Sequence, residues 1–197
     1  MRKNLLIGLL VFSLAALLVV GGTMAWFTDS QTADNKFTAG TVAIEIDEHD
    51  FQDITNWNPG DTTNKDVSIK STGSKGTYVR VKLTPVWGAL DGDDFIEADP
   101  ALPTTNVTLN ISDSTKWIYS DGWYYYSEIM SQDEETDLLL DSVTIAGLGT
   151  DNSYQGKTLK VDVEAEAVQA SHEAYKDAFG ITSLPDGVEA WSESTPE

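Results

Sequence analysis

Residues that could do catalytic chemistry are scarce in this 197-residue sequence. It contains two histidines, His49 and His172, and no cysteine. A zinc site needs three or four ligands at suitable spacing, and the sequence has no His-Glu-x-x-His motif. It also lacks a Gly-x-Ser-x-Gly nucleophile turn and a phosphate-binding loop. We therefore interpret both histidines as solvated surface residues, and we do not expect an enzyme.

The densest group of potential metal ligands is the acidic segment DGDDFIEAD, residues 91–99. Carboxylate oxygens are the ligands that calcium prefers, but the segment has no glycine at the sixth position and no glutamate at the twelfth of an EF-hand loop. This mismatch favours an acidic surface loop, with calcium as the alternative and no other cofactor expected. The candidate calcium ligands are Asp91, Asp93, Asp94, Glu97 and Asp99.

Two further motifs suggest contact with sugars. Asn106 and Asn110 each begin an Asn-x-Ser/Thr sequon, which is used only where the host glycosylates exported proteins, and both lie in or beside a predicted strand. The aromatic run from Trp123 to Tyr126 could stack on carbohydrate. Because aromatic residues favour strands and dominate buried cores, we favour a division of this run between the core and the sheet surface.

The elements that position these residues are mostly strands. Apolar and polar residues alternate with period two in most segments, which indicates antiparallel sheets with one wet face. Asp121-Gly122 is a strong hairpin turn between two aromatic strands. One short helix is expected in 170–180, and the acidic tail 189–197 is expected to fray. The predicted fold is all-β, a jelly roll or antiparallel sandwich of eight or nine strands with one or two short helices. The predicted strand segments are 42–47, 66–70, 78–84, 107–112, 116–127, 138–145 and 158–168.

The N-terminus has the pattern of a secretory signal peptide. Arg2 and Lys3 precede an uncharged apolar run, Leu5–Val20, and the small-residue exit ends at Ala25. The alternative is a membrane anchor, but a run of this length is shorter than the roughly 20 residues that a span needs. We therefore predict residues 1–25 as the signal peptide and 26–197 as a single domain.

Charge narrows the classes of partner. The chain carries 12 basic and 32 acidic residues, a net charge of −20, and removal of residues 1–25 would make it −22. A protein of this charge is repelled by phosphate backbones, so we expect no nucleic-acid partner. Without cysteines no disulfide can form, but about 170 residues can bury a sufficient core.

The stretch GGTMAWFTDSQTADNKFTAGTVAIEI resembles the N-terminus of the TasA/camelysin family, secreted fibre proteins of the bacterial biofilm matrix and cell surface. The resemblance is most specific in residues 21–41 and extends to later segments such as WNPGDTTNKDVSIK. The positions that match the family pattern are Gly21, Gly22, Thr23, Ala25, Trp26, Phe27, Asp29, Asn35, Phe37, Ala39, Gly40 and Thr41.

This resemblance implies a route to assembly. A SipW-type signal peptidase would cut between Ala25 and Trp26, and the new N-terminal segment, within residues 26–40, would pair as a strand with the neighbouring subunit of a homopolymer. An exposed strand edge permits such an addition. The alternative is an ordinary first strand of its own domain. The candidate donor residues are Trp26, Phe27, Thr28, Asp29, Ser30, Gln31, Thr32, Ala33, Asp34, Asn35, Lys36 and Phe37.

The sequence therefore favours a secreted structural subunit of extracellular fibres. Its expected partners are further copies of itself, the signal peptidase and other matrix proteins. Two alternatives stay open, a camelysin-type metalloprotease at the cell surface and a carbohydrate-binding adhesin that uses the aromatic hairpin.

Overall fold

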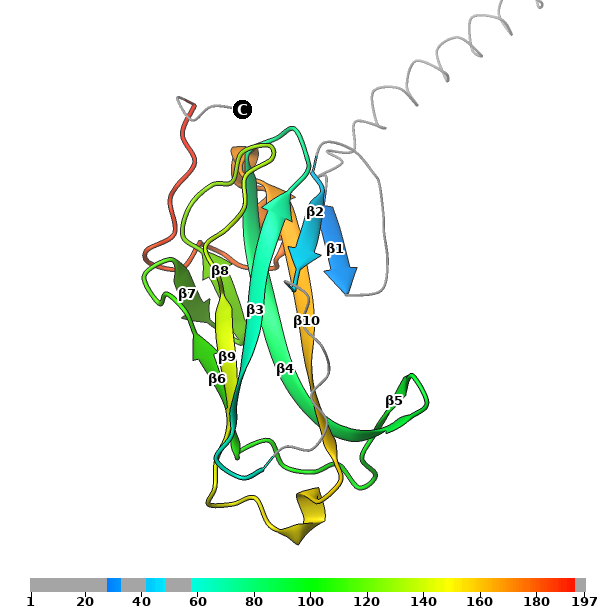
Figure 1. Ribbon diagram of the computed structural model, residues 1–197. Coiled ribbons are helices and arrows are strands. Elements are labelled where there is room, and N and C mark those ends of the chain that lie inside the picture. The colour runs from blue at the N-terminus through cyan, green and yellow to red at the C-terminus, as the bar shows by residue number, and fades with distance from the viewer. Residues whose placement is uncertain (1–27, 33–41, 49–57, 194–197) are drawn as a thin grey trace, which may run out of the picture.

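Two antiparallel sheets packed face to face form the fold (Figure 1). The computed structural model describes residues 28–32, 42–48 and 58–193. The large sheet has the order β1 (Thr28–Thr32), β10 (Thr158–Gln169), β4 (Thr77–Asp91), β8 (Trp123–Tyr126) and β7 (Trp117–Ser120), and β5 (Asp94–Glu97) pairs with the far end of β4. The small sheet has the order β2 (Ile44–Asp47), β3 (Thr62–Ser71), β9 (Leu140–Ile145) and β6 (Val107–Ile111). The predicted all-β sandwich is confirmed, whereas the jelly-roll connection stays a prediction.

The main core lies between the two sheets and follows the predicted alternation. Val67 and Ile69 of β3 are fully buried, and so are Val79 and Val81 of β4. Full burial of one such side chain contributes about 1.5–3 kcal/mol. Trp117 completes this core, 1% exposed, with its indole N–H donating to the carbonyl of Asp137 at 3.0 Å. The aromatic strand β7 is therefore anchored in the core.

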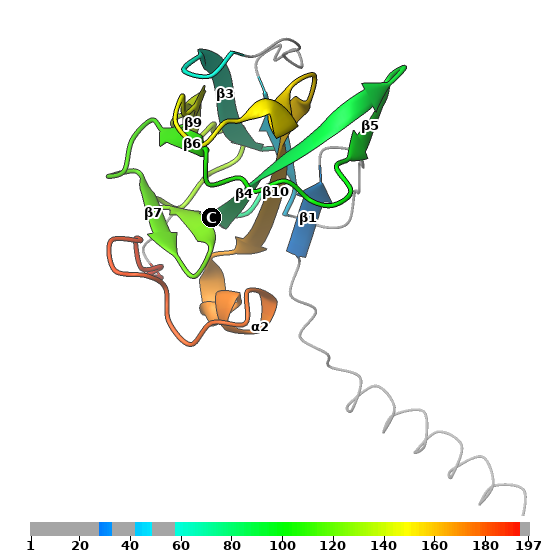
Figure 2. The ribbon, with the colours of Figure 1, turned by 90° about the horizontal axis from the view of Figure 1, so that it is seen from below.

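β4 is much longer than the predicted strand 78–84. It continues to Asp91, reverses at Gly92 with φ of 67°, and returns as β5. The acidic segment 91–99 is thus a strand hairpin rather than the expected loop, and the β4–β5 hairpin projects away from the sandwich (Figure 2). Sequence alone missed β5 because its four residues, DFIE, are too few and too acidic to show strand periodicity.

The β7–β8 hairpin forms as predicted. Asp121 and Gly122 both have positive φ, 50° and 86°, which is the geometry of a type I′ turn. Glycine and aspartate adopt this backbone more readily than other residues. The turn pairs Tyr119 with Tyr124 and Trp117 with Tyr126 across the two strands.

Residues 170–193, the C-terminal segment, form a second layer on the outer face of the large sheet. They contain the short turn η2 (Ser171–Glu173) and the one-turn helix α2 (Tyr175–Ala178), while η1 (Asn152–Tyr154) precedes β10. The Tyr78 hydroxyl donates to the carbonyl of Glu189 at 2.9 Å and accepts from the N–H of Trp191 at 2.8 Å. The expectation that the tail frays is therefore wrong for residues 189–193, because buried groups of β4 hold its backbone.

Candidate functional site

β1 forms one edge of the large sheet, and it belongs to the segment predicted to be donated. It pairs antiparallel with β10, with Thr28 opposite Val168 and Thr32 opposite Glu164. Its sequence, TDSQT, is polar at every position. A strand that is polar at every position specifies its register weakly. Backbone pairing over five residues is the contact that this segment offers.

The structure describes five of the twelve candidate donor residues, those of β1. They form a strand, and in the single chain that strand pairs with β10 of the same molecule, which is the arrangement of the alternative, an ordinary first strand. Donation of this strand to a neighbouring subunit stays a prediction. Trp26, Phe27 and residues 33–37 lie outside the described residues. The predicted cut between Ala25 and Trp26 lies outside them too, as does His49.

β10 offers a longer edge than β1 covers. All twelve residues of β10 pair with β4, from Thr158 opposite Gly88 to Gln169 opposite Thr77. On its other side β1 pairs only with residues 164–168. Among the described strands, β1 is the one that pairs with this side of β10. That pairing shows that β10 can take up a strand here through its backbone N–H and carbonyl groups.

Ion pairs neutralise the outer face of β10 next to this edge. Glu166 lies 2.6 Å from the Arg80 guanidinium, and Glu164 lies 3.4 Å from the Lys82 ammonium. A third pair joins Lys160 and Asp162 along β10 at 2.8 Å. In a chain with a net charge of −20, these pairs reduce the local repulsion that an approaching acidic subunit would meet.

Arg80 is the most enclosed of these cations, with 9% of its side chain exposed. Its guanidinium carbon lies 4.2 Å from the ring centre of Trp123 and 4.3 Å from that of Phe179. It also donates to the Tyr125 hydroxyl at 3.2 Å and to the Phe179 carbonyl at 3.1 Å. Arg80 thus joins β10, β8 and the C-terminal segment, and it keeps Glu166 in a fixed position.

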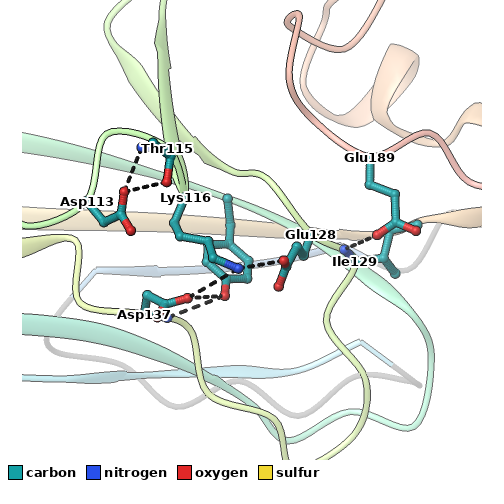
Figure 3. Close-up of polar contacts among 8 residues, drawn as sticks. Asp113, Thr115, Lys116, Glu128, Ile129, Asp137 and Glu189 are labelled. Atoms are coloured by element: carbon teal, nitrogen blue, oxygen red, sulfur yellow. Dashed lines mark hydrogen bonds and ion pairs between the residues drawn. The ribbon is translucent and has the colours of Figure 1, made fainter.

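A polar network at the β7–β8 end shows what chemistry the described residues can do. Lys116 Nζ lies 2.6 Å from Glu128 and 3.9 Å from Asp137 (Figure 3), and the Tyr126 hydroxyl donates to Asp137 at 2.8 Å. Burial, followed by the bond to Asp137, raises the pKa of Tyr126, and the bond to Glu128 raises the pKa of Lys116. At neutral pH the phenol is uncharged and the lysine is protonated, so neither acts as a base or a nucleophile.

The turn before β7 is fixed by Asp113. Its carboxylate accepts from the Thr115 hydroxyl at 2.6 Å and from the Thr115 N–H at 2.7 Å, and these bonds lower the pKa of Asp113. Glu189 accepts from the Ile129 N–H at 3.4 Å, which ties the C-terminal segment to the same end of the sandwich (Figure 3). The carboxylates of Asp113 and Glu189 thus accept hydrogen bonds from backbone N–H groups and fix the positions of the segments that carry them.

The predicted metal ligands do not gather into a site. Asp91, Asp93 and Asp94 lie at the tip of the β4–β5 hairpin and are exposed, while Glu97 ends β5 and Asp99 follows it. Among the described residues, no group of three or more histidine, cysteine, aspartate or glutamate residues is placed to hold a metal ion. Calcium binding by this segment stays a prediction without a geometric site to support it.

His172 lies in the C-terminal segment, far in sequence from His49. Its ring stacks on Trp191, with ring centres 5.9 Å apart and planes 24° from parallel. Its backbone φ is 60°, in the left-handed region that few residues other than glycine adopt. The contact with Trp191 gives the His172 ring a structural role, since the ring covers an indole.

The aromatic hairpin is used mainly within the molecule. Tyr125 and Tyr126 are buried, and Trp123 packs against Arg80. Tyr119 is the exposed aromatic of this hairpin, with 64% of its surface exposed, and it packs against Tyr124 at 4.9 Å between ring centres. This division between core and surface is the one that the sequence favours.

The two sequons lie in different environments. Asn106 is 3% exposed, and its amide donates to the Thr150 hydroxyl at 2.9 Å and accepts from the Trp87 indole at 3.4 Å. The folded chain therefore shields Asn106 from a glycosyltransferase. Asn110 is half-buried and donates to the hydroxyls of Ser142 and Thr144.

Comparison with known proteins gives two matches. Residues 1–87 match the family model described as Camelysin metallo-endopeptidase. Over 96 residues the chain is 35% identical to the protein described as "Major biofilm matrix component" of Bacillus subtilis (strain 168). Both matches agree with the resemblance to the TasA/camelysin family, and each covers less than half of the chain. The matched residues include β1, β2, β3 and most of β4, but the match ends well before β10.

The match to the relative covers 48% of this chain and 34% of the relative, so it spans about a third of that protein's length. No solved structure matches the chain significantly. In the described residues, no helix is both long enough and apolar enough to cross a membrane. The likeness to these proteins thus comes from sequence, and the arrangement of β1 on β10 comes from the structure of this chain.

Sequence reasoning missed the Arg80–Glu166 pair and the edge of β10. A signal was available: Arg80 and Lys82 alternate with apolar residues on one predicted strand, and Glu164 and Glu166 do so on another. Opposite charges on the wet faces of two antiparallel strands favour pairing between those strands. The charge pattern does not give the order of the strands in the sheet, so it could not predict that β10 lies next to an edge strand.

Proposed function

We propose that this protein is a structural subunit of an extracellular matrix and that it polymerises by passing its N-terminal strand from one copy to the next. The observation that carries this proposal is the position of β1, an all-polar strand at a sheet edge that pairs with β10. Every copy presents the same β10 edge, so a contact made within one chain can also be made between two identical chains.

The matrix role rests on the relatives. The matched protein of Bacillus subtilis is described as a major biofilm matrix component, and this match supports an extracellular location and a structural role. Export begins with removal of residues 1–25 by a SipW-type signal peptidase. The freed segment Trp26–Phe37 has twelve residues, and an extended chain of that length spans about 40 Å, which is enough to reach a neighbouring subunit.

Charge adds a condition for assembly. Each trimmed subunit carries a net charge of −22, so subunits repel one another at low ionic strength. The ion pairs beside the β10 edge reduce this repulsion locally, and added salt or divalent cations reduce it over the whole subunit. Electron microscopy of the secreted protein across ionic strength should show filaments at higher salt.

A pair of cysteines tests strand exchange directly, because the chain has none of its own. Thr32 and Glu164 are register partners, so cysteines at these positions come within disulfide distance when β1 pairs with β10. Oxidising the monomeric double variant Thr32→Cys/Glu164→Cys should lock β1 onto its own β10 and prevent filaments, and reduction should restore them. A locked variant that still polymerises would contradict strand exchange.

The matched control is Glu45→Cys/Lys70→Cys, an exposed register pair on β2 and β3 whose disulfide should leave assembly unchanged. A second arm mixes subunits that carry only Thr32→Cys with subunits that carry only Glu164→Cys. Filaments of this mixture should give disulfide-linked dimers of the two variants on oxidation. Filaments without such dimers would mean that another surface joins the subunits.

The description of the matched family keeps a second function under consideration, metallo-endopeptidase activity. Casein hydrolysis by the purified protein that disappears with a chelator, and also with His49→Ala/His172→Ala, would favour a protease. Casein that stays intact with and without added zinc would argue against it. We favour the structural role because the matched relative is described as a major biofilm matrix component.

A further inference from the structure

The outer face of the small sheet carries a block of uncharged hydrogen-bonding residues on a strongly acidic protein. Three neighbouring strands contribute two residues each, and strand register aligns them in two rows. One row crosses the sheet through Thr62, Thr144 and Thr108, and the other crosses it through Asn64, Ser142 and Asn110. We call these six residues the hydroxyl–amide array.

The array lies on the wet side of its strands. Val143 and Ile145 of β9 alternate with the array residues and are buried in the core, which places Ser142 and Thr144 on the opposite face. Thr62, Asn64 and Thr108 are exposed. Adjacent strands in a sheet lie about 4.8 Å apart, so the array spans about 10 Å across the three strands.

Hydrogen bonds within the array hold its side chains in place. The hydroxyls of Thr62 and Thr144 lie 2.8 Å apart. The Asn110 amide donates to Ser142 at 3.1 Å and to Thr144 at 3.0 Å. These bonds order the side chains before any ligand arrives, so little rotational freedom is lost on binding.

The absence of charge in these six residues selects the partner. The chain has a net charge of −20, so anionic polymers are repelled by the molecule as a whole. A cationic partner would be drawn to acidic surfaces such as the β4–β5 hairpin tip instead. An uncharged polymer rich in hydroxyl groups meets no such repulsion, and it supplies donors and acceptors that match threonine, serine and asparagine.

We propose that the hydroxyl–amide array binds a neutral polysaccharide along the outer face of the small sheet. Each contact is a hydrogen bond exchanged against water, so one array binds weakly. Repetition of the array along a fibre would strengthen binding through multivalency, and this part of the inference rests on the proposed polymerisation. Binding by the single subunit does not depend on it.

Affinity electrophoresis of the secreted protein in native gels tests the proposal, with dextran as the neutral polymer and alginate as the anionic one. Dextran should retard the protein and alginate should not. Thr62→Ala/Thr108→Ala should weaken the retardation by about tenfold, the value expected for losing two hydrogen-bonding side chains. Thr84→Ala/Thr182→Ala, which changes two exposed threonines elsewhere, should leave it unchanged.

Thr108→Asp gives a second variant at an exposed position, and a charge in the array should remove the dextran effect. Migration unchanged by dextran, retardation by alginate alone, or equal retardation of both double variants would each overturn the proposal. Dimers that disappear with Thr62→Ala/Thr108→Ala would show that a second copy covers the array, and this would also overturn it. The cysteine-locked monomer keeps the two proposals apart, since it cannot exchange β1 but should still bind dextran.

Discussion

Arg80 and Glu166 face each other across β4 and β10, with the guanidinium 2.6 Å from the carboxylate and almost enclosed by protein. The rings of Trp123 and Phe179 lie against the same guanidinium. Because Phe179 belongs to the C-terminal segment, this ion pair links the strand that accepts β1 to the layer on the outer face of the large sheet. The pair makes the β10 edge rigid where a donated strand would attach.

Removal of Arg80 should therefore destabilise the fold strongly. Arg80→Met leaves Glu166 without its cation and removes the bonds to Tyr125 and Phe179, so we expect a loss of roughly 2–4 kcal/mol in the free energy of unfolding. Urea unfolding monitored by tryptophan fluorescence measures this loss. Lys82→Met is the control, because its pair with Glu164 is exposed and should contribute less than about 1 kcal/mol. Equal losses in the two variants would contradict the role of burial.

The β4–β5 hairpin depends on a glycine. A Cβ at Gly88 would collide with the carbonyl of Ile96 and lie 2.5 Å from Cζ of Phe95. Gly88→Ala should therefore open the hairpin at a cost of about 1–3 kcal/mol. Hydrogen exchange of the Ala98 amide, which donates to the Trp87 carbonyl at 2.9 Å, should become faster. Gly147→Ala has open space around its Cβ and should leave this amide protected.

Two buried serines should respond in opposite ways to alanine. Among the described residues, Ser71 Oγ is the buried side-chain atom without a hydrogen-bond partner. Ser71→Ala should thus be neutral or stabilising, because it removes a desolvated hydroxyl. The Ser68 hydroxyl donates to Glu135 at 2.5 Å, and Ser68→Ala should cost about 1–3 kcal/mol. Thermal unfolding of both variants measures these changes in stability. A clear loss of stability in Ser71→Ala would show that the Ser71 hydroxyl has a hydrogen-bond partner.

Stability should fall at alkaline pH because of tyrosine. Burial raises the pKa of Tyr78, Tyr124 and Tyr126 in the folded protein, whereas tyrosines of the unfolded chain titrate near pH 10. Above about pH 10 the unfolded chain loses these protons first, so the free energy of unfolding decreases as pH rises. Below pH 10 this contribution is fully present. Tyr126→Phe should flatten the alkaline decrease, and an unchanged slope would mean that Tyr126 titrates normally in the fold.

Local sequence predicted most of the strands for a clear reason. The alternation in 42–47, 66–70 and 158–168 survives in the fold because one face of each strand packs into the core. The Asp121-Gly122 turn was also readable, since its dipeptide favours the required positive φ. The short strand β5 could not be predicted from its own residues, because it packs closely against Gly88 on the other side of the hairpin turn. The docked tail could not be predicted either, because Tyr78, which holds it, lies more than a hundred residues earlier in the chain.

Of the candidate site, the sequence supplied the donor segment and the structure supplied its partner. The family resemblance singled out residues 26–37, and Thr28–Thr32 form a strand as expected. The acidic segment 91–99 looked like the best metal site by composition, yet its pleated hairpin spreads the carboxylates apart. Composition counts ligands, but only the path of the backbone decides whether they converge.

The sequence by itself determined an all-β chain with large negative charge, because period-two alternation and the count of charges are local properties of the chain. The tertiary structure decided that β1 lies on β10, that Arg80 is enclosed against Glu166, and that six uncharged residues line up on the small sheet. Those relationships join positions up to 140 residues apart (168 − 28), since Thr28 lies opposite Val168. They depend on strand order and register, which follow from the packing of the whole core and not from any one segment.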